Sequence, residues 1–230
     1  MLRDQAEASP NAVAYRFIVA GDELEHLTFR ALEAQALAVA ERLVRDGRRG
    51  ERALLLYRPG LEFTVAFFAC ALAGVVAVPA NPPEPARAAR ALPRLLAIIE
   101  DAEASLLLSS RTLRDFAESV LPGNNALLQL PFYATDPGPA PMGDSLPAIA
   151  PEALAFLQYT SGSTSTPRGV AISHEAVMRN LAMIDARLGP TMARAVSWVP
   201  FYHDLGLIGG VLLPIYAGGT SVLLSPLEFL

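Results

Sequence analysis

The sequence predicts an α/β fold in which mostly parallel sheets are flanked by helices. Short apolar segments alternate along the chain with longer segments whose apolar residues recur at helical spacing, which is the pattern of parallel βαβ units. Several of the short segments are apolar without a break, as in strands that are buried on both faces of a sheet. The 230 residues, 52% of them hydrophobic, are enough to build a sizeable core.

The predicted elements of the first 130 residues follow from these periodicities. Thr28 is a good N-cap, and Leu27 and Leu32 stand where a hydrophobic staple would place them. Gly47 is the expected stop of the same helix. Pro93 must kink its helix or mark a late start. We expect helices at 2–8, 28–45, 61–73, 86–100 and 113–120, and strands at 13–19, 53–57, 75–78, 105–108 and 126–130.

A proline-rich segment then interrupts the alternation. Residues 131–151 contain six prolines and little periodicity, which is typical of a linker or a surface excursion. We therefore divide the chain into a first α/β subdomain at 1–133, a linker or excursion at 134–151, and the start of a second α/β subdomain at 152–230. In the last part we expect strands at 154–159, 170–172 and 195–198 and a helix at 175–188.

Composition excludes several classes of function. The net charge is −5 and no basic cluster is present, which argues against a nucleic-acid partner. The single cysteine, Cys70, allows no disulfide or zinc framework. The uncharged runs 63–83 and 205–227 approach the length of a membrane span, but glycines and prolines break each into a helix, a turn and a strand. With no signal-peptide pattern at residues 1–7, we expect a soluble, cytoplasmic protein without a membrane span.

The segment 160–168 is the most informative stretch of the chain. It joins two apolar strands and consists of small hydroxyl residues and glycine, followed by Pro167 and Arg168. Backbone N–H groups in such a loop can close around an anion, and an arginine adds a fixed charge with a planar fork of donors. A Walker phosphate loop cannot be placed here because the chain has no lysine, whereas a flexible Ser/Thr linker is the plain alternative. The candidate phosphate-binding residues are Thr160, Ser161, Gly162, Ser163, Thr164 and Arg168.

A second motif occupies residues 197–210. It places an aromatic pair and the dipeptide His203-Asp204 after a strand, at the edge of a parallel sheet where ligands usually bind. A metal pair would need more ligands than these two. The residues alone leave two alternatives open. His203 is an acid/base residue, or His203 and Asp204 simply cap the following helix.

The two motifs together resemble the adenylate-forming superfamily, which includes acyl-CoA synthetases, peptide-synthetase adenylation domains and luciferases. Its phosphate loop usually reads Thr-Ser-Gly-Ser-Thr-Gly-x-Pro-Lys-Gly. Here Ser165 replaces a glycine, which stiffens the loop, and Arg168 replaces the lysine, which keeps the charge but changes its reach. Residues 198–210, 212–219 and 223–230, together with 76–79 and 82–83, are similar to the fatty acyl-AMP ligase branch.

The resemblance implies the N-terminal part of the adenylate-forming fold and an activity. A fatty acid would be activated with ATP and Mg²⁺ to an acyl-adenylate and passed to an acyl carrier protein, often in polyketide or lipopeptide assembly. His203 would orient the acyl carboxylate, and the substrate-binding set would be His203, Asp204, Gly206, Gly209 and Gly210; no protein metal ligand is expected. Close helix packing is the equal alternative for the glycines.

The resemblance also implies what lies outside the chain. The adenine and ribose contacts and a C-terminal domain would follow residue 230, so we expect an N-terminal portion that is inactive alone. An acyl-CoA ligase and a non-catalytic acyl- or partner-binding module remain the alternatives.

Overall fold

The computed structural model describes residues 1–83, 88–121, 125–136, 143, 145–159, 167–189 and 194–226, with only the backbone of 88–90. Its strands form two sheets. The six-stranded sheet has the order β6-β5-β3-β4-β7-β8, and the four-stranded sheet has the order β2-β1-β10-β9. The strands are β1 Val13–Val19, β2 Asp22–Thr28, β3 Arg52–Leu56, β4 Val76–Ala80, β5 Leu106–Ser109, β6 Phe132–Ala134, β7 Leu154–Tyr159, β8 Gly169–Ser173, β9 Arg194–Ser197 and β10 Thr220–Leu224.

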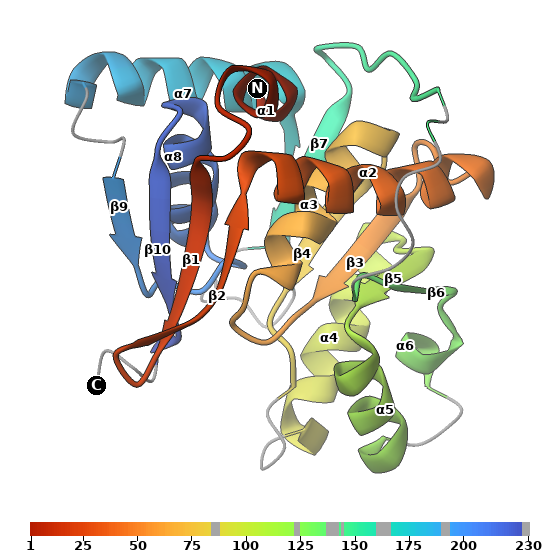
Figure 1. Ribbon diagram of the computed structural model, residues 1–230. Coiled ribbons are helices and arrows are strands. Elements are labelled where there is room, and N and C mark those ends of the chain that lie inside the picture. Colours follow the sequence, from red (N-terminus) through yellow and green to blue (C-terminus); the bar gives the residue numbers. More distant parts are fainter. Residues whose placement is uncertain are drawn as a thin grey trace.

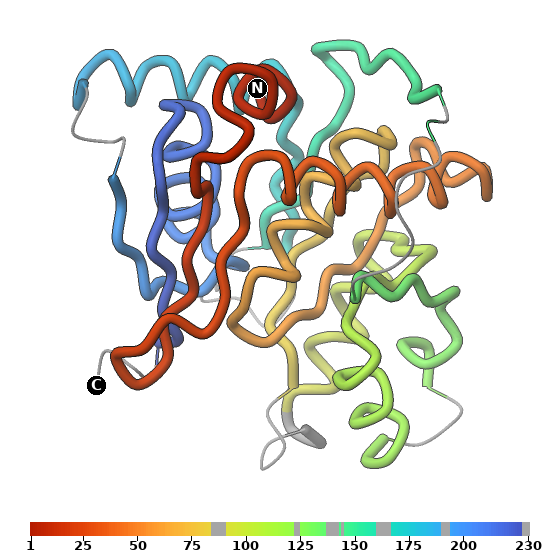
Figure 2. Tube along the Cα trace, viewed as in Figure 1, coloured from red at the N-terminus to blue at the C-terminus, as the bar shows by residue number. Residues whose placement is uncertain are grey.

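Both sheets are parallel except at one edge. In the six-stranded sheet only the β7–β8 pair is antiparallel, and in the four-stranded sheet only the β1–β2 pair is. Strand β1, from the first part of the chain, lies beside β10, from its last part, as Figure 2 shows by the adjacent red and blue tubes. The predicted α/β class with mostly parallel sheets is confirmed.

Helices fill the space between the two sheets and cover the outer face of the larger one (Figure 1). Helix α3 packs on β3 and β4, while α2 packs on α3 and reaches β1 and β2. Helices α4 and α5 lie on the opposite face of the six-stranded sheet. The helices are α1 Leu2–Ala8, α2 Phe29–Arg45, α3 Glu62–Ala73, α4 Ala88–Ala102, α5 Arg111–Val120, α6 Ala126–Gln129, α7 His174–Leu188, the π-helix η3 Gly206–Leu212 and α8 Leu213–Tyr216.

Strand alternation produces two hydrophobic cores. Leu55 of β3 and Phe156 of β7 face the core shared with α2, α3 and the four-stranded sheet. Their neighbours Leu54 and Leu157 face the core shared with α4 and α5. Successive side chains of a strand point to opposite faces, so β3, β4, β5 and β7 each contribute buried residues to both cores.

Local capping explains several helix starts. The Thr28 hydroxyl accepts a hydrogen bond from the Ala31 N–H at 3.1 Å, and the Ser173 hydroxyl accepts one from Ala176 at 3.2 Å. These bonds satisfy N–H groups that have no partner within the first helical turn. Gly47 follows α2 with a left-handed φ of 71°, which an L-residue rarely adopts.

The structure differs from the expected elements at three places. The strand predicted at 126–130 is the short helix α6, because the side chain of Asn125 accepts a hydrogen bond from the Leu128 N–H at 3.1 Å and starts a helical turn. Strand β6 then follows, inside the segment expected to lack regular structure. Strand β2 was not expected at all, since its residues are mostly polar and exposed.

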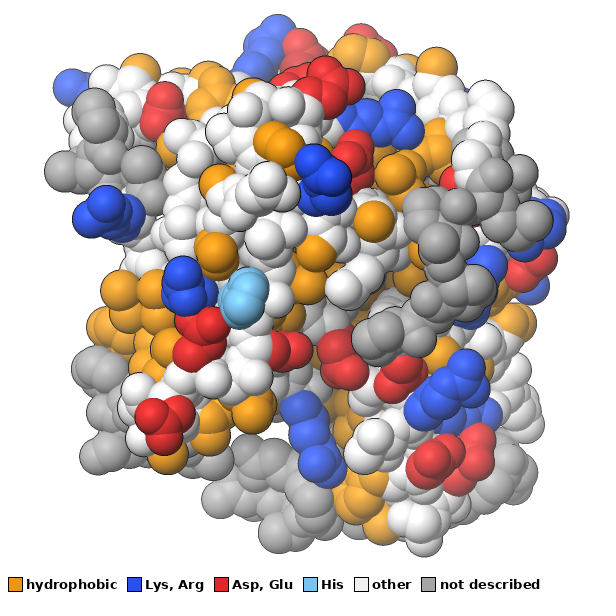
Figure 3. Space-filling view, viewed as in Figure 1, with side chains coloured by type: hydrophobic (Ala, Val, Ile, Leu, Met, Phe, Trp, Pro, Cys, Tyr) orange, Lys and Arg blue, Asp and Glu red, His pale blue; other side chains and the backbone are white. Residues whose placement is uncertain are grey.

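The expected division of the chain at 134–151 stays a prediction. Each sheet draws strands from both sides of that segment, because β7 pairs with β4 and β10 pairs with β1. Among the described residues, no helix is long and apolar enough to cross a membrane. On the face shown in Figure 3, acidic and basic side chains lie interspersed.

Candidate active site

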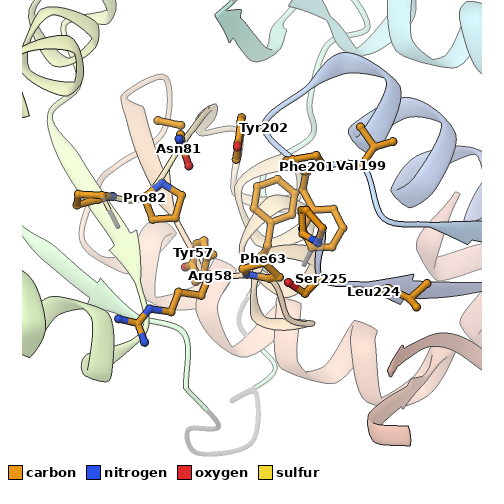
Figure 4. A pocket seen from close by; sticks show the side chains of 15 residues that line it. Tyr57, Arg58, Phe63, Asn81, Pro82, Val199, Phe201, Tyr202, Leu224 and Ser225 are labelled. Carbon is orange, nitrogen blue, oxygen red and sulfur yellow. The ribbon is translucent and has the colours of Figure 1, made fainter. Parts of the chain in front are cut away.

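A pocket of about 360 Å³ lies where the carboxyl ends of strands from both sheets meet (Figure 4). Segments following β3 and β4 of the larger sheet and β9 and β10 of the smaller sheet contribute to its wall. Ligands in α/β proteins bind at this edge of the strands. The lining residues are Tyr57, Arg58, Pro59, Phe63, Ala80, Asn81, Pro82, Pro83, Val199, Pro200, Phe201, Tyr202, Leu224, Ser225 and Pro226.

Aromatic rings form the floor between the two sheets. The rings of Phe63 and Phe201 lie 5.3 Å apart between centroids, and Tyr57 meets Phe63 edge to face at 6.1 Å. The buried Tyr57 hydroxyl shares a 2.9 Å hydrogen bond with the Thr135 hydroxyl. Burial raises the pKa of Tyr57 well above its usual value, so the phenol stays neutral and acts as a packing and hydrogen-bonding group.

The backbone around His203 is fixed by its neighbours. Its N–H donates to the Pro200 carbonyl at 3.0 Å, and its carbonyl accepts from the Leu207 N–H at 2.8 Å. The imidazole ring lies 5.0 Å from the Tyr202 ring, between centroids, and is exposed. Asp204 is also exposed and accepts a 2.7 Å hydrogen bond from the Leu205 N–H, so it supports the start of the helix.

Two of the three predicted substrate-binding glycines have a packing reason. A Cβ on Gly206 would lie 2.3 Å from the Pro200 carbonyl oxygen, and a Cβ on Gly210 would lie 2.8 Å from the Ser197 hydroxyl oxygen. A Cβ on Gly209 would meet only a side-chain carbon of Leu205, at 3.6 Å. The glycines therefore let η3 pack closely on the segment that carries His203, and their contact with a substrate stays a prediction.

The predicted phosphate loop lies partly outside the described residues. Nothing is described for Thr160, Ser161, Gly162, Ser163 and Thr164, whereas Arg168 is described and exposed. The two ends of the loop are held together, because Tyr159 and Gly169 are cross-strand partners of β7 and β8. A Cβ on Gly169 would lie 2.9 Å from the Tyr159 ring, so the ring lies directly over this glycine.

Two residues that sequence reasoning missed fix the start of this loop. The Tyr159 hydroxyl donates a 2.5 Å hydrogen bond to the Asp101 carboxylate of α4. Burial, and then the nearby Asp101 carboxylate, raise the pKa of Tyr159, which keeps the donor protonated. On the other face of β7, the Gln158 side-chain amide donates to the Tyr202 carbonyl at 2.7 Å. A glutamine inside the apolar run 154–159 was the signal that could have indicated it.

Metal binding has no protein ligand set in the described part of the chain. No group of three or more His, Cys, Asp or Glu side chains in it could hold a metal ion. In nucleotide-binding proteins, Mg²⁺ is commonly bound by the substrate phosphates together with one or two protein carboxylates at most.

The chain belongs to the AMP-binding enzyme family, which matches residues 2–230. It is 40% identical over 94% of its length to 37% of the medium-chain-fatty-acid–[acyl-carrier-protein] ligase JamA of Moorena producens. It superposes on a fatty acid AMP ligase of Legionella pneumophila with a TM-score of 0.87 and 33% identity, over 99% of this chain and 39% of that one. A fatty acyl-adenylate ligase of L. pneumophila, in complex with acyl adenylate and pyrophosphate, gives a TM-score of 0.84 and 32% identity over 99% and 39%. The chain thus spans about two fifths of the length of the curated relatives it matches.

Proposed function

We propose that the gene product activates a fatty acid with ATP to an acyl-adenylate and passes the acyl group to an acyl carrier protein. The observation that carries this proposal is a hydrogen bond between Gln158, two residues before the predicted phosphate loop, and Tyr202 of the second motif, 44 residues further along the chain. An adenylating enzyme must hold the phosphates and the carboxylate at one place. This bond joins the strand that leads into the predicted phosphate loop to residues 200–207, the segment that we call the His203 turn.

The reaction requires alignment rather than a protein nucleophile. The fatty-acid carboxylate oxygen attacks the α-phosphorus of ATP, the bond to the bridging oxygen breaks, and pyrophosphate leaves with that electron pair. Thr160, Ser161, Gly162, Ser163, Thr164 and Arg168 would hold the β- and γ-phosphates of the magnesium–ATP substrate. Donors and positive charge there stabilise the leaving group.

His203 and the apolar pocket would serve the other substrate. His203 would orient the carboxylate beside the α-phosphate, with Asp204 fixing the helix start behind it. The apolar pocket supports a substrate with an apolar group, and the relatives named for fatty-acid ligation, JamA among them, support the same choice. We propose ATP and an acyl carrier protein as the enzyme's other substrates, and the cytoplasm as its location.

Mass spectrometry of acyl-AMP tests the proposal. The 230-residue chain and the full-length gene product are each incubated with ATP, Mg²⁺ and fatty acids of increasing length, with and without coenzyme A and an acyl carrier protein. Acyl-AMP, followed by acyl carrier protein loading, is the expected result for the full-length product. Acyl-CoA instead would identify an acyl-CoA ligase, and fatty-acid binding without any adenylate would identify a binding module.

A further inference from the structure

We propose that Gln158 is a positioning residue that holds the His203 turn against the strand leading into the phosphate loop. The inference rests on the proposed function and adds a residue to it. It starts from position: β7 alternates between the two cores, and residue 158 falls on the face toward the four-stranded sheet. The Tyr202 carbonyl lies within hydrogen-bond distance of Gln158 on that face.

The geometry leaves no ambiguity in the orientation of this amide. A carbonyl oxygen can only accept, so the atom of Gln158 that lies 2.7 Å from the Tyr202 oxygen must be the NH₂ nitrogen. The Tyr202 carbonyl directly precedes His203. The His203 N–H and carbonyl are hydrogen-bonded to Pro200 and Leu207. Three successive backbone groups of this turn, the Tyr202 carbonyl and the His203 N–H and carbonyl, are therefore held by hydrogen bonds.

The other half of the amide is unusual. Gln158 is 5% exposed, and its side-chain oxygen is buried without a hydrogen-bond partner among the described residues. A buried, unpaired oxygen costs free energy that an apolar side chain of similar size would avoid. A buried polar side chain that leaves one of its atoms unsatisfied is typical of a functional position. The function we infer for Gln158 is the placement of His203 relative to the predicted phosphate loop.

The test compares Gln158→Met with a matched control in the full-length gene product. Methionine keeps the length of the side chain and removes both the donor and the unpaired oxygen. Ser109→Ala is the control, because Ser109 is also buried and also donates a 2.7 Å bond to a backbone carbonyl of another strand, that of Leu56. We expect Gln158→Met to lower the kcat of acyl-AMP formation about tenfold, because the net contribution of one hydrogen bond corresponds to about that factor in rate. The KM for ATP should change less than about twofold. Ser109→Ala should keep kcat within about twofold.

A cycle with His203→Ala separates positioning from general damage. If Gln158 acts through His203, adding Gln158→Met to His203→Ala causes no further loss of kcat. An equal loss in both backgrounds, or a kcat for Gln158→Met no lower than that of Ser109→Ala, would overturn the inference.

Hydrogen exchange gives a readout that does not need activity. In Gln158→Met the amides of residues 203–207 should exchange at least about tenfold faster than in the wild type, while those in Ser109→Ala should not. A wild type that makes no acyl-AMP refutes the proposed function only, since hydrogen exchange still tests whether Gln158 holds the His203 turn. Unchanged hydrogen exchange in Gln158→Met refutes this positioning role even where the wild type is active.

Discussion

Alanine substitution at Gly206 tests how tightly η3 packs on the turn that carries His203. The added Cβ would lie 2.3 Å from the Pro200 carbonyl oxygen, 2.7 Å from that of Val199 and 2.9 Å from the Pro200 carbonyl carbon. All three atoms belong to the backbone, so no side-chain rotation can relieve the contact. The helix and the turn must move apart, and overpacking of this kind costs about 1–3 kcal/mol.

Gly209→Ala is the matched control in the same helix. Its Cβ would make an ordinary contact of 3.6 Å with a flexible Leu205 side chain. Neither Gly206 nor Gly209 has a positive φ, so alanine can adopt the backbone dihedral angles at both positions. Both variants gain the same helix propensity, up to about 1 kcal/mol. The difference between them therefore isolates the packing cost.

Thermal unfolding of the two variants measures that difference. For a chain of 150–250 residues, 1 kcal/mol corresponds to about 2–4 °C in Tm, so Gly206→Ala should melt about 2–12 °C below Gly209→Ala. Gly209→Ala should melt at or slightly above the wild type. Equal melting temperatures, or a more stable Gly206→Ala, would refute the close packing of η3 on the Val199–Pro200 backbone.

Three further predictions concern ionisable side chains. Tyr159→Phe should lower the free energy of unfolding in urea by about 1 kcal/mol through loss of the bond to Asp101, whereas Glu103→Gln, which breaks an exposed ion pair, should change it by less than about 0.5 kcal/mol; equal effects would contradict the anchoring role. Burial raises the pKa of the Cys70 thiol far above its usual 9.0, so native protein should resist iodoacetamide and its stability should fall as pH rises above about 9, where only the unfolded thiol ionises; rapid native alkylation would refute this. Burial lowers the pKa of His174 from 6.5, so unfolding titrations should show stability falling as pH drops below about 6.5, more steeply in the wild type than in His174→Gln; parallel curves would show that His174 does not contribute.

Local sequence signals predicted most of the fold because they report local physics. The predicted strand at 154–159 agrees with β7, and the cap at Thr28 starts α2 as expected. Strand β2 escaped because an exposed edge strand needs no apolar alternation, and its sequence Asp-Glu-Leu-Glu-His-Leu-Thr has little. Residues 126–130 looked like a strand because a short apolar run fits either structure, and the Asn125 cap decided for a helix.

The site could be predicted only as far as its motifs. His203 and Arg168 stand in recognisable patterns, but the strand ends meet only because β10 pairs with β1 as well as with β9, and the β1 pairing joins residues more than 200 positions apart. The π-helix after Asp204 has no local signature either. Its Gly210 and Val211 carbonyls accept hydrogen bonds from the buried hydroxyls of Ser221 and Tyr15, which only the folded chain brings there.

The register of β7 is what joins these parts. Gln158 and Tyr159 are consecutive, so they point to opposite faces. They tie the start of the predicted phosphate loop to two different layers, the His203 turn on one side and α4 on the other. A slip of one residue would exchange them, placing an amide in the core with α4 and removing the donor to the Tyr202 carbonyl. The buried neighbours Phe156 and Leu157 prevent that slip, since each fills a different core. The hydrophobic pattern of this strand therefore determines the placement of the two polar side chains at its end.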